Sequence, residues 1–405
     1  MIETTKLKRS LGLPLVALYG LGNILGAGIY ILIGKVAGFA GTSTTLAFLI
    51  AMIIAGFTAF SYMELAGRYP VSASASVYLH RAFGKRWLSV LIGLAMVFGG
   101  ITSAAALSQG FAGYLSSFFA ISVPVASVGL LVVLGALTIK GIGESAKAAA
   151  TFTAIEVVGL LLVIWFGRTA IASAEISSVF TIDQTVGVGG IIAGAFLAFY
   201  AFIGFEDMAN VAEEVKNPRR TMPLAILFAL VSATVLYLLV VMVSTAMVAP
   251  SELATNEAPL TLVFERSGVD NYLVLSAIGM VAAINGVIVQ IIMGSRILYG
   301  LAKQGWISSM FAEVNSTFKT PVTATLVVLG SMIAGTLLLP LVSLAQLTSL
   351  LVLSIFTLVN ASLVVIKFRK PKHSGFISVP KIVPIAGTLL CLMTISYQIY
   401  SWLFV

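Results

Sequence analysis

The sequence predicts an all-helical polytopic membrane protein in which two helices are broken. Three observations carry this prediction: an apolar composition, eleven long hydrophobic segments, and glycine clusters inside the first and sixth of them. Of the 405 residues, 59% are hydrophobic and 9% are charged, whereas an average soluble domain has about 25% charged residues. A soluble globule this poor in charge would expose large apolar patches. The composition therefore excludes an ordinary soluble enzyme, a disordered chain and a nucleic-acid binder.

Eleven hydrophobic segments are long enough to cross a bilayer with a hydrocarbon core of about 30 Å as helices. Their runs are nearly continuous and lack the two-residue alternation of membrane strands. The predicted spans are residues 14–34, 44–67, 87–118, 122–140, 147–167, 187–212, 223–249, 271–300, 321–341, 344–366 and 381–402.

The Lys and Arg residues in the connections predict the orientation. All 23 of them except Lys35, Arg168 and Arg266 fall on one side of the predicted membrane, and basic loops are enriched on the cytoplasmic side. We therefore expect a multi-pass protein of the cytoplasmic membrane with its N-terminus in the cytoplasm. Eleven crossings then place the C-terminus outside. The net charge of +8 reflects this topology, and attraction to anionic lipids is secondary.

Glycines cluster in two of the predicted spans. The first holds four glycines between residues 20 and 28, and the sixth holds four between residues 187 and 194. Glycine costs about 1 kcal/mol in a helix interior, so each cluster indicates either close helix packing or an interrupted helix. The two spans open two five-helix halves of opposite topology, which is typical of transporters built on an inverted repeat.

This organisation predicts five parts of the chain. Residues 1–13 form a cytoplasmic segment, and residues 14–167 the first repeat. Residues 168–186 form an extracellular connection, and residues 187–366 the second, inverted repeat. Residues 367–405 form a cytoplasmic loop and an accessory eleventh helix.

An interrupted helix frees peptide groups at membrane depth. In lipid such groups cost several kcal/mol each unless they line a cavity or hold a ligand. The break offers N–H donors at a positive dipole end and carbonyl acceptors at a negative end. A ligand with a carboxylate and an ammonium on adjacent atoms matches this pattern, so a free α-amino acid is the predicted ligand.

Four motifs resemble the amino acid–polyamine–organocation family of secondary transporters. They are Gly22-Asn23-Ile24-Leu25-Gly26-Ala27-Gly28-Ile29-Tyr30, Tyr62-Met63-Glu64-Leu65-Ala66-Gly67-Arg68-Tyr69-Pro70, Phe199-Tyr200-Ala201-Phe202-Ile203-Gly204-Phe205-Glu206 with its continuation to Arg220, and Ser295-Arg296-Ile297-Leu298-Tyr299-Gly300-Leu301-Ala302-Lys303-Gln304-Gly305. The resemblance covers residues from about 10 to 400 and is close to bacterial amino-acid permeases and the cationic amino-acid transporter branch. It implies the five-plus-five inverted-repeat fold of the sodium-coupled leucine transporters.

The resemblance also implies how the substrate is held. N–H groups in the first break would hold the carboxylate, and carbonyls in both breaks would accept from the ammonium. Tyr200 would cover the substrate and Phe202 would shape its side-chain pocket, although aromatic side chains at helical spacing also occur in ordinary packing. The substrate-binding residues implied in this way are Ile24, Gly26, Ala27, Gly28, Tyr200, Phe202 and Ile203.

Three polar residues inside apolar spans are candidates for coupling. Glu156 lies near the middle of the fifth span, where a charge costs a few kcal/mol or more. It stands where several proton-coupled relatives carry a lysine, and it fits a proton carrier, a sodium ligand or a hydrogen-bonded structural carboxyl. Glu206 follows the second break, where it would accept from the substrate, close a gate or bond to the first span. Asn285 in the eighth span would contact Glu156 or make a plain interhelical hydrogen bond.

Six charged residues gather on the predicted cytoplasmic side. Ion pairs among them would latch an inner gate, and the alternative is that they are solvated loop charges. They are Glu64, Glu213, Glu214, Lys216, Arg219 and Arg220.

The sequence gives no sign of a metal or cofactor. His80 and His373 lie far apart in predicted loops, and the single Cys391 excludes an intramolecular disulfide framework and a thiolate cluster. The absence of a phosphate-binding P-loop argues against ATP-driven transport. The predicted function is a secondary transporter, not an enzyme, that moves an amino acid by alternating access with a proton or sodium ion, or as an exchanger. An amine or polyamine transporter and a non-transporting amino-acid sensor remain alternatives, and the oligomeric state is open.

Overall fold

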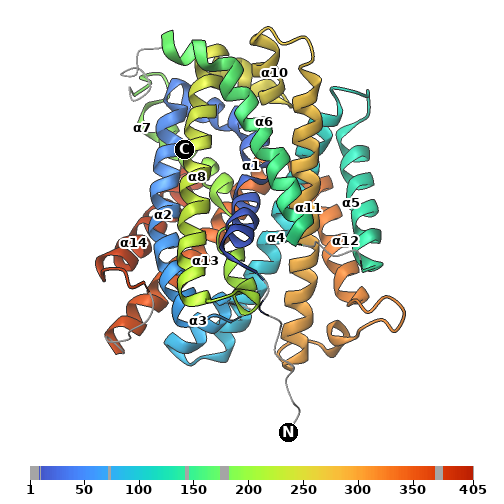
Figure 1. Cartoon of the computed structure of the whole chain (residues 1–405), viewed down its shortest axis with the longest axis vertical. Coiled ribbons are helices and arrows are strands. Elements are labelled where there is room, and N and C mark those ends of the chain that lie inside the picture. Colours follow the sequence, from blue (N-terminus) through green and yellow to red (C-terminus); the bar gives the residue numbers. More distant parts are fainter. Residues whose placement is uncertain are drawn as a thin grey trace.

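The computed structural model describes residues 9, 11–71, 74–141, 146–173, 182–369 and 377–404. These residues are almost entirely helical, and the long helices run side by side along the long axis of the molecule (Figure 1). The helices of the first half are α1 (Leu13–Ala40), α2 (Thr44–Arg68), α3 (Ser74–Phe83), α4 (Arg86–Leu115), α5 (Val123–Ile139) and α6 (Ala146–Ser173). Those that follow are α7 (Gly187–Ala198), α8 (Pro218–Met247), α9 (Pro250–Thr255), α10 (Pro259–Arg266), α11 (Leu273–Lys303), α12 (Val322–Leu338), α13 (Leu341–Arg369) and α14 (Ile382–Phe404). Short 3-10 helices are η1 (Gly41–Ser43), η3 (Phe199–Phe202), η4 (Asp207–Glu214) and η5 (Ser309–Ala312).

Ten of the eleven predicted spans each coincide with one α-helix, whereas the sixth, residues 187–212, begins as α7 and continues after Ala198 as 3-10 helices. Among the described residues, eight stretches are long and apolar enough to cross a membrane, and one of them, Leu13–Arg68, runs through both α1 and α2. The apolar helices α5 and α12 are shorter, at 17 residues each. The chain is therefore an all-helical, multi-pass membrane protein.

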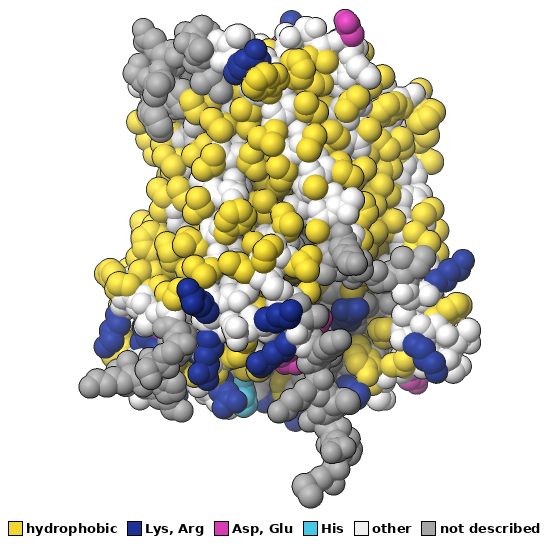
Figure 2. Space-filling view, viewed as in Figure 1, with side chains coloured by type: hydrophobic (Ala, Val, Ile, Leu, Met, Phe, Trp, Pro, Cys, Tyr) yellow, Lys and Arg dark blue, Asp and Glu magenta, His cyan; other side chains and the backbone are white. Residues whose placement is uncertain are grey.

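The surface of the molecule agrees with this arrangement. Figure 2 shows a broad band of hydrophobic side chains around the middle, which suits contact with lipid tails. Most of the Lys and Arg side chains in this view gather at the end that carries α3. We refer to this end as the basic end.

The short helix α3 was not predicted and corrects the placement of His80, which we expected in a loop. The helix is amphipathic, with a buried face at the spacing of successive helical turns. That face consists of Ala75, Tyr78, Leu79 and Ala82. A search for membrane-length apolar runs misses such a helix because it is short and polar on its other side. His373 lies outside the described residues, and those that are described hold no group of three His, Cys, Asp or Glu side chains suited to a metal ion.

Two further unpredicted helices, α9 and α10, cover the C-terminal half of α1 at the end opposite the basic end (Figure 1). A Cβ atom added to Gly34 would lie only 2.2 Å from the carbonyl oxygen of Leu253, so the two backbones touch directly. Lys35 adds an ion pair with Glu257, with 3.2 Å between Nζ and Oε1, and donates to the carbonyl of Ala254 at 3.0 Å. The contacts close this end of the bundle around α1.

The connection before α7 is fixed by Asp183. Its Oδ1 accepts from the backbone N–H and hydroxyl of Thr185, and its Oδ2 accepts from the same two groups of Thr42. These hydrogen bonds, those of Thr185 first, hold the pKa of the Asp183 carboxyl well below its usual range. The start of α7 is thereby tied to η1, beside the end of α1.

Candidate functional site

Helix α1 is interrupted at Gly26. This residue has φ 18° and ψ −166°, which is not helical, and regular helix continues on both sides of it. A Cβ atom added at Gly26 would meet no other atom within 4 Å, so the break borders open space. The first glycine cluster of the sequence thus marks a true interruption.

The second break follows α7. Regular helix ends at Ala198, the 3-10 turn η3 follows, and Ile203 is extended with φ −69° and ψ 143°. Gly204 then takes φ 128°, a conformation that residues with a side chain rarely adopt. The chain continues as η4 and not as α-helix.

The two breaks pack backbone against backbone. A Cβ atom on Gly204 would lie 2.4 Å from the carbonyl oxygen of Asn23, and one on Gly28 would lie 2.9 Å from Cα of Ala201. Both distances are too short for any real side chain. Glycine at these two positions therefore allows the interrupted segments to approach one another.

Tyr237 of α8 joins the two breaks. Its fully buried hydroxyl lies 2.6 Å from the carbonyl oxygen of Ile24, 3.2 Å from that of Leu25 and 3.0 Å from that of Ala201. The single hydroxyl proton can serve one carbonyl at a time, so the remaining acceptor capacity stays in the breaks. Sequence analysis missed this residue, although a tyrosine in the middle of an aliphatic span is a signal, because its buried hydroxyl needs a partner.

Replacement of Tyr237 by Phe tests this link. Loss of the hydrogen bonds should loosen both breaks and weaken apparent substrate affinity about tenfold, the value of one to two buried hydrogen bonds. The concentration dependence of uptake into proteoliposomes measures the change, and Tyr400→Phe on the exposed part of α14 is the control. Unaltered affinity in Tyr237→Phe would contradict the assignment.

A cavity of about 50 Å³ lies at the breaks. One wall is formed by the break residues, and five of the seven predicted substrate-binding residues belong to it, namely Ile24, Gly26, Gly28, Tyr200 and Ile203. The facing wall comes from α4 and α11 and consists of Ser103, Leu107, Asn285, Gly286, Val289 and Gln290. Gly22, Asn23, Gly204 and Asp207 complete the lining.

Of the other two predicted substrate-binding residues, the structure describes the side chain of Phe202 alone. Ala27 lies within the first break, but its side chain is outside the described part of the structure. Phe202 is fully buried and turns to Tyr237, with 5.3 Å between ring centroids, and to Phe48, with 6.4 Å. The structure therefore places Phe202 in the packing behind the break. Tyr200, in contrast, reaches Ser103 of α4, with 2.9 Å between the two hydroxyl oxygens.

Glu156 is completely buried on α6 and lies one hydrogen bond from the cavity wall. Its Oε1 accepts from Nδ2 of Asn285 at 3.2 Å, which is the contact that we considered from the sequence. Its backbone carbonyl accepts from the hydroxyl of Tyr30 at 2.6 Å. Asn285 itself lines the cavity, so the side chain of Glu156 is linked to the cavity through one amide.

Glu206 plays a local part in the second break. Its Oε2 accepts from the backbone N–H of Gly204 at 2.9 Å, and the residue is only 8% exposed. This hydrogen bond closes the turn that carries the unusual glycine conformation. Glu206 does not belong to the cavity lining.

Among the six predicted gating residues, Glu64 forms its ion pairs with residues outside the group. Glu64 is buried and pairs with Arg68 at 2.5 Å and Lys367 at 2.7 Å, which joins α2 to α13. Glu213 is half-buried, Glu214 lines a second cavity, and Lys216, Arg219 and Arg220 are exposed. A latch among these six residues stays a prediction.

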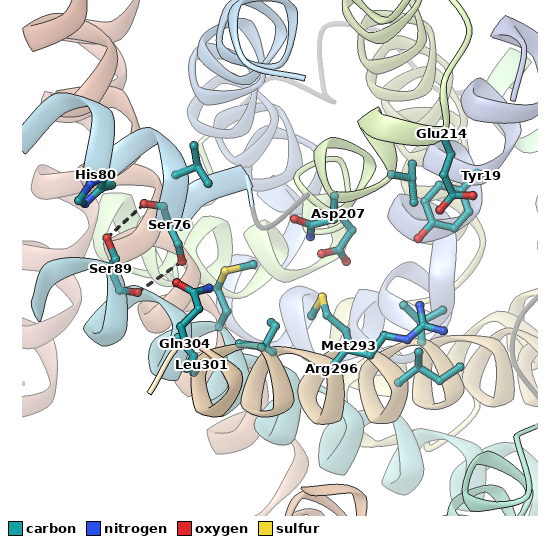
Figure 3. A pocket seen from close by; sticks show the side chains of 18 of the residues that line it. Tyr19, Ser76, His80, Ser89, Asp207, Glu214, Met293, Arg296, Leu301 and Gln304 are labelled. Carbon is teal, nitrogen blue, oxygen red and sulfur yellow. Dashed lines mark hydrogen bonds between the residues drawn. The ribbon is translucent and has the colours of Figure 1, made fainter. Parts of the chain in front are cut away.

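A second cavity of about 1000 Å³ extends from the breaks toward the basic end, and we call it the vestibule. Figure 3 shows Met293 and Arg296 of α11, with Gln304 directly after this helix, on one side of it, and Asp207, Glu214 and Tyr19 opposite. His80 of α3 contributes to its lining. Asp207 and Val289 line both cavities, so the vestibule adjoins the small cavity.

Comparisons with known proteins agree with these observations. The profile of the family described as "Amino acid permease" matches residues 11–404. The branched-chain amino acid permease BcaP of Bacillus subtilis is 29% identical over 96% of this chain and 88% of its own length. The cationic amino acid transporter 4 of Mus musculus is 31% identical over 90% of this chain but only 61% of its own length.

A third relative, the methylthioribose transporter of Bacillus subtilis, is 26% identical over 96% of this chain and 88% of its own length. The chain spans about three fifths of the cationic transporters it matches. The family match extends over both breaks, both cavities and every described helix. The chain belongs to the amino acid permease family, a group of amino acid–polyamine–organocation transporters and not of enzymes.

Proposed function

We propose that this protein is a secondary active transporter that moves a free amino acid across the cytoplasmic membrane by alternating access. The observation that carries the proposal is the pair of broken helices, which meet backbone to backbone beside a small cavity. Interrupted backbone at membrane depth is tolerated where it lines a cavity or binds a ligand. The small cavity is therefore the proposed substrate site.

The two ends of an amino acid suit the two kinds of peptide group at the breaks. We infer that the helix segment after Gly26 presents its first N–H groups at the break, as a helix N-terminus does, and such donors suit a carboxylate. Carbonyls of the broken segments at Ile24 and Tyr200 suit an ammonium. Ile24 retains acceptor capacity because a carbonyl oxygen has two lone pairs and Tyr237 uses one.

The order of the helices supports an inverted repeat. The broken helix α1 is followed by the apolar helices α2, α4, α5 and α6, and the broken helix α7 by α8, α11, α12 and α13. Each half thus has one broken and four continuous apolar helices, within residues 14–167 and 187–366. In this proposal α14 is an accessory helix that follows the repeats.

The cavities support an inward-facing conformation. The vestibule lies toward the basic end, which the positive-inside rule assigns to the cytoplasm. At the opposite end α9 lies on α1, and Lys35 pairs with Glu257. Alternating access then requires that the contacts around Lys35 open while the vestibule closes.

Glu156 is the proposed coupling residue. It is a buried carboxyl whose hydrogen-bond partner Asn285 lines the substrate cavity, and ionisable groups inside a membrane commonly mark ion or proton pathways. Substrate that displaces Asn285 would alter the surroundings of Glu156 directly. We propose that Glu156 carries the proton that drives uptake.

Counterflow in proteoliposomes tests the transport function. Vesicles loaded with an unlabelled amino acid mixture should accumulate a radiolabelled member of that mixture above the level of empty vesicles. Binding without counterflow would indicate an amino-acid sensor, and counterflow of amines in place of amino acids would indicate an amine transporter. The printed names of the relatives include branched-chain amino acid, cationic amino acid and methylthioribose transporters, so the panel must be broad.

A further inference from the structure

Two amide side chains at the small cavity have buried polar atoms without a hydrogen-bond partner. Nδ2 of Asn23, in the first broken helix, is one, and Oε1 of Gln290, on α11, is the other. A buried donor or acceptor without a hydrogen-bond partner is destabilising because it has lost its contact with water, and such groups are rare in native proteins. At a cavity wall, the missing partner is supplied most simply by a bound molecule.

The position of these two amides distinguishes them from others. Asn360 and Gln398 also have a buried amide oxygen without a partner, but neither lines a described cavity. At the small cavity one unpartnered donor and one unpartnered acceptor come from the two opposite walls. Rotation of both amides together would exchange the two roles and would still offer one donor and one acceptor.

The wall on the α4 and α11 side leaves little room. A Cβ atom on Gly286 would lie 2.6 Å from Cδ1 of Leu107, and one on Gly100 would lie 2.8 Å from Oε1 of Gln290. The two helices are therefore in close contact at the cavity. A volume of about 50 Å³ holds only a few water-sized groups, so a long substrate side chain does not fit in this conformation.

The charges around the cavity are few. Its lining contains no Lys or Arg, and its one carboxylate is Asp207, at the border with the vestibule. Among the described residues, the wall formed by α4 and α11 is thus polar but uncharged, with Ser103, Asn285 and Gln290 as its hydrogen-bonding side chains.

We propose that the preferred substrate is an amino acid with a small uncharged side chain that both donates and accepts hydrogen bonds, a hydroxyl or a carboxamide. This inference rests on the proposed function, since it assumes that the substrate backbone occupies the breaks. The side chain accepts from Asn23 and donates to Gln290. An aliphatic side chain does neither, an ammonium or guanidinium only donates, and an ionised carboxylate only accepts.

Competition in the counterflow assay tests the inference with isosteric pairs. Threonine against valine and asparagine against leucine compare side chains of similar shape with and without the polar group. Each polar member should compete at least about tenfold better than its apolar partner, because the apolar one leaves buried groups unpaired. Equal or better competition by valine, leucine or a cationic amino acid would overturn the inference while leaving amino-acid transport intact. Absence of counterflow with every amino acid would overturn both.

Gln290→Met provides the matched variant, since it keeps the length of the side chain and removes the amide. It should weaken threonine competition about tenfold and leave that of valine nearly constant, so that the preference falls. Gln398→Met removes another amide whose oxygen is buried without a partner, on α14 and away from the cavity, and should keep the wild-type preference. A preference that is unchanged in Gln290→Met, or equally reduced in Gln398→Met, would overturn the assignment of Gln290. If Gln290→Met does not fold, Gln290→Glu is the alternative variant, since it keeps an acceptor but loses the donors. Threonine should still compete in Gln290→Glu, and loss of threonine competition there would count against the assignment.

Discussion

Replacement of Gly204 by Ala should abolish transport and destabilise the protein. The residue has φ 128°, a conformation that costs a side-chain-bearing residue about 1–3 kcal/mol. The added Cβ atom would also lie 2.4 Å from the carbonyl oxygen of Asn23, and backbone cannot swing aside as a flexible side chain can. Uptake into proteoliposomes and the melting temperature of the detergent-purified protein measure the two effects.

A second glycine gives the matched control. Gly330 lies exposed within α12, and a Cβ atom there would meet nothing within 4 Å. Gly330→Ala should therefore transport normally and gain up to about 1 kcal/mol from better helix propensity. Normal transport in Gly204→Ala would show that the close contact between the two breaks is not needed for the function.

The second large effect is expected at Glu156. Glu156→Gln keeps the shape of the side chain and its acceptor for Asn285 but cannot release a proton. Uptake driven by a pH gradient should be abolished, because no proton would move with the substrate, while counterflow between equal pH values should be largely retained. Parallel measurements of the two modes in the same vesicles separate coupling from binding.

Glu313→Gln, on an exposed loop, is the control for this substitution and should behave as wild type. Full gradient-driven uptake in Glu156→Gln would remove Glu156 as the carrier. If uptake by the wild-type protein depends on a sodium gradient and Glu156→Gln loses this dependence, the sodium-ligand alternative is favoured. Loss of both modes together would favour a structural carboxyl.

The main features of the fold could be predicted because they depend on composition and length. Membrane helices need about twenty apolar residues each, and this requirement marks the long helices in the sequence with boundaries close to those observed. The break in α1 was also predictable, since it lies in the first glycine cluster. The second cluster lies instead in the regular part of α7, where Gly190 and Gly194 pack against the end of α1. The short helices α3, α9 and α10 were missed because they are too short for that criterion.

The candidate site was only partly predictable. Motifs identified the break residues such as Gly26 and Ile203, because the backbone itself forms that wall. The facing wall depends on which positions of α4 and α11 turn inward, so Ser103 and Gln290 emerged only from the structure. Phe202 shows the opposite case, because its neighbour Tyr200 faces the cavity while Phe202 itself packs against Tyr237.

Charged residues gave the weakest predictions. Glu64 was expected in a cluster with residues of the loop before α8, but its partners are Arg68, one helical turn away, and Lys367 of α13. The predicted topology assigns a charged residue to one side of the membrane, but it does not identify the residue with which it forms an ion pair. Pairing across helices requires the packing of α2 against α13, which no local pattern encodes.

The account depends on recognition of both the carboxylate and the ammonium of a substrate by the broken helices. Competition binding to the purified protein with a transported amino acid, its decarboxylated amine and its deaminated acid measures this most directly. Each truncated analogue should bind at least about tenfold more weakly, because a charged partner of the peptide groups is removed. An amine or acid that binds as tightly as the intact amino acid would contradict the account.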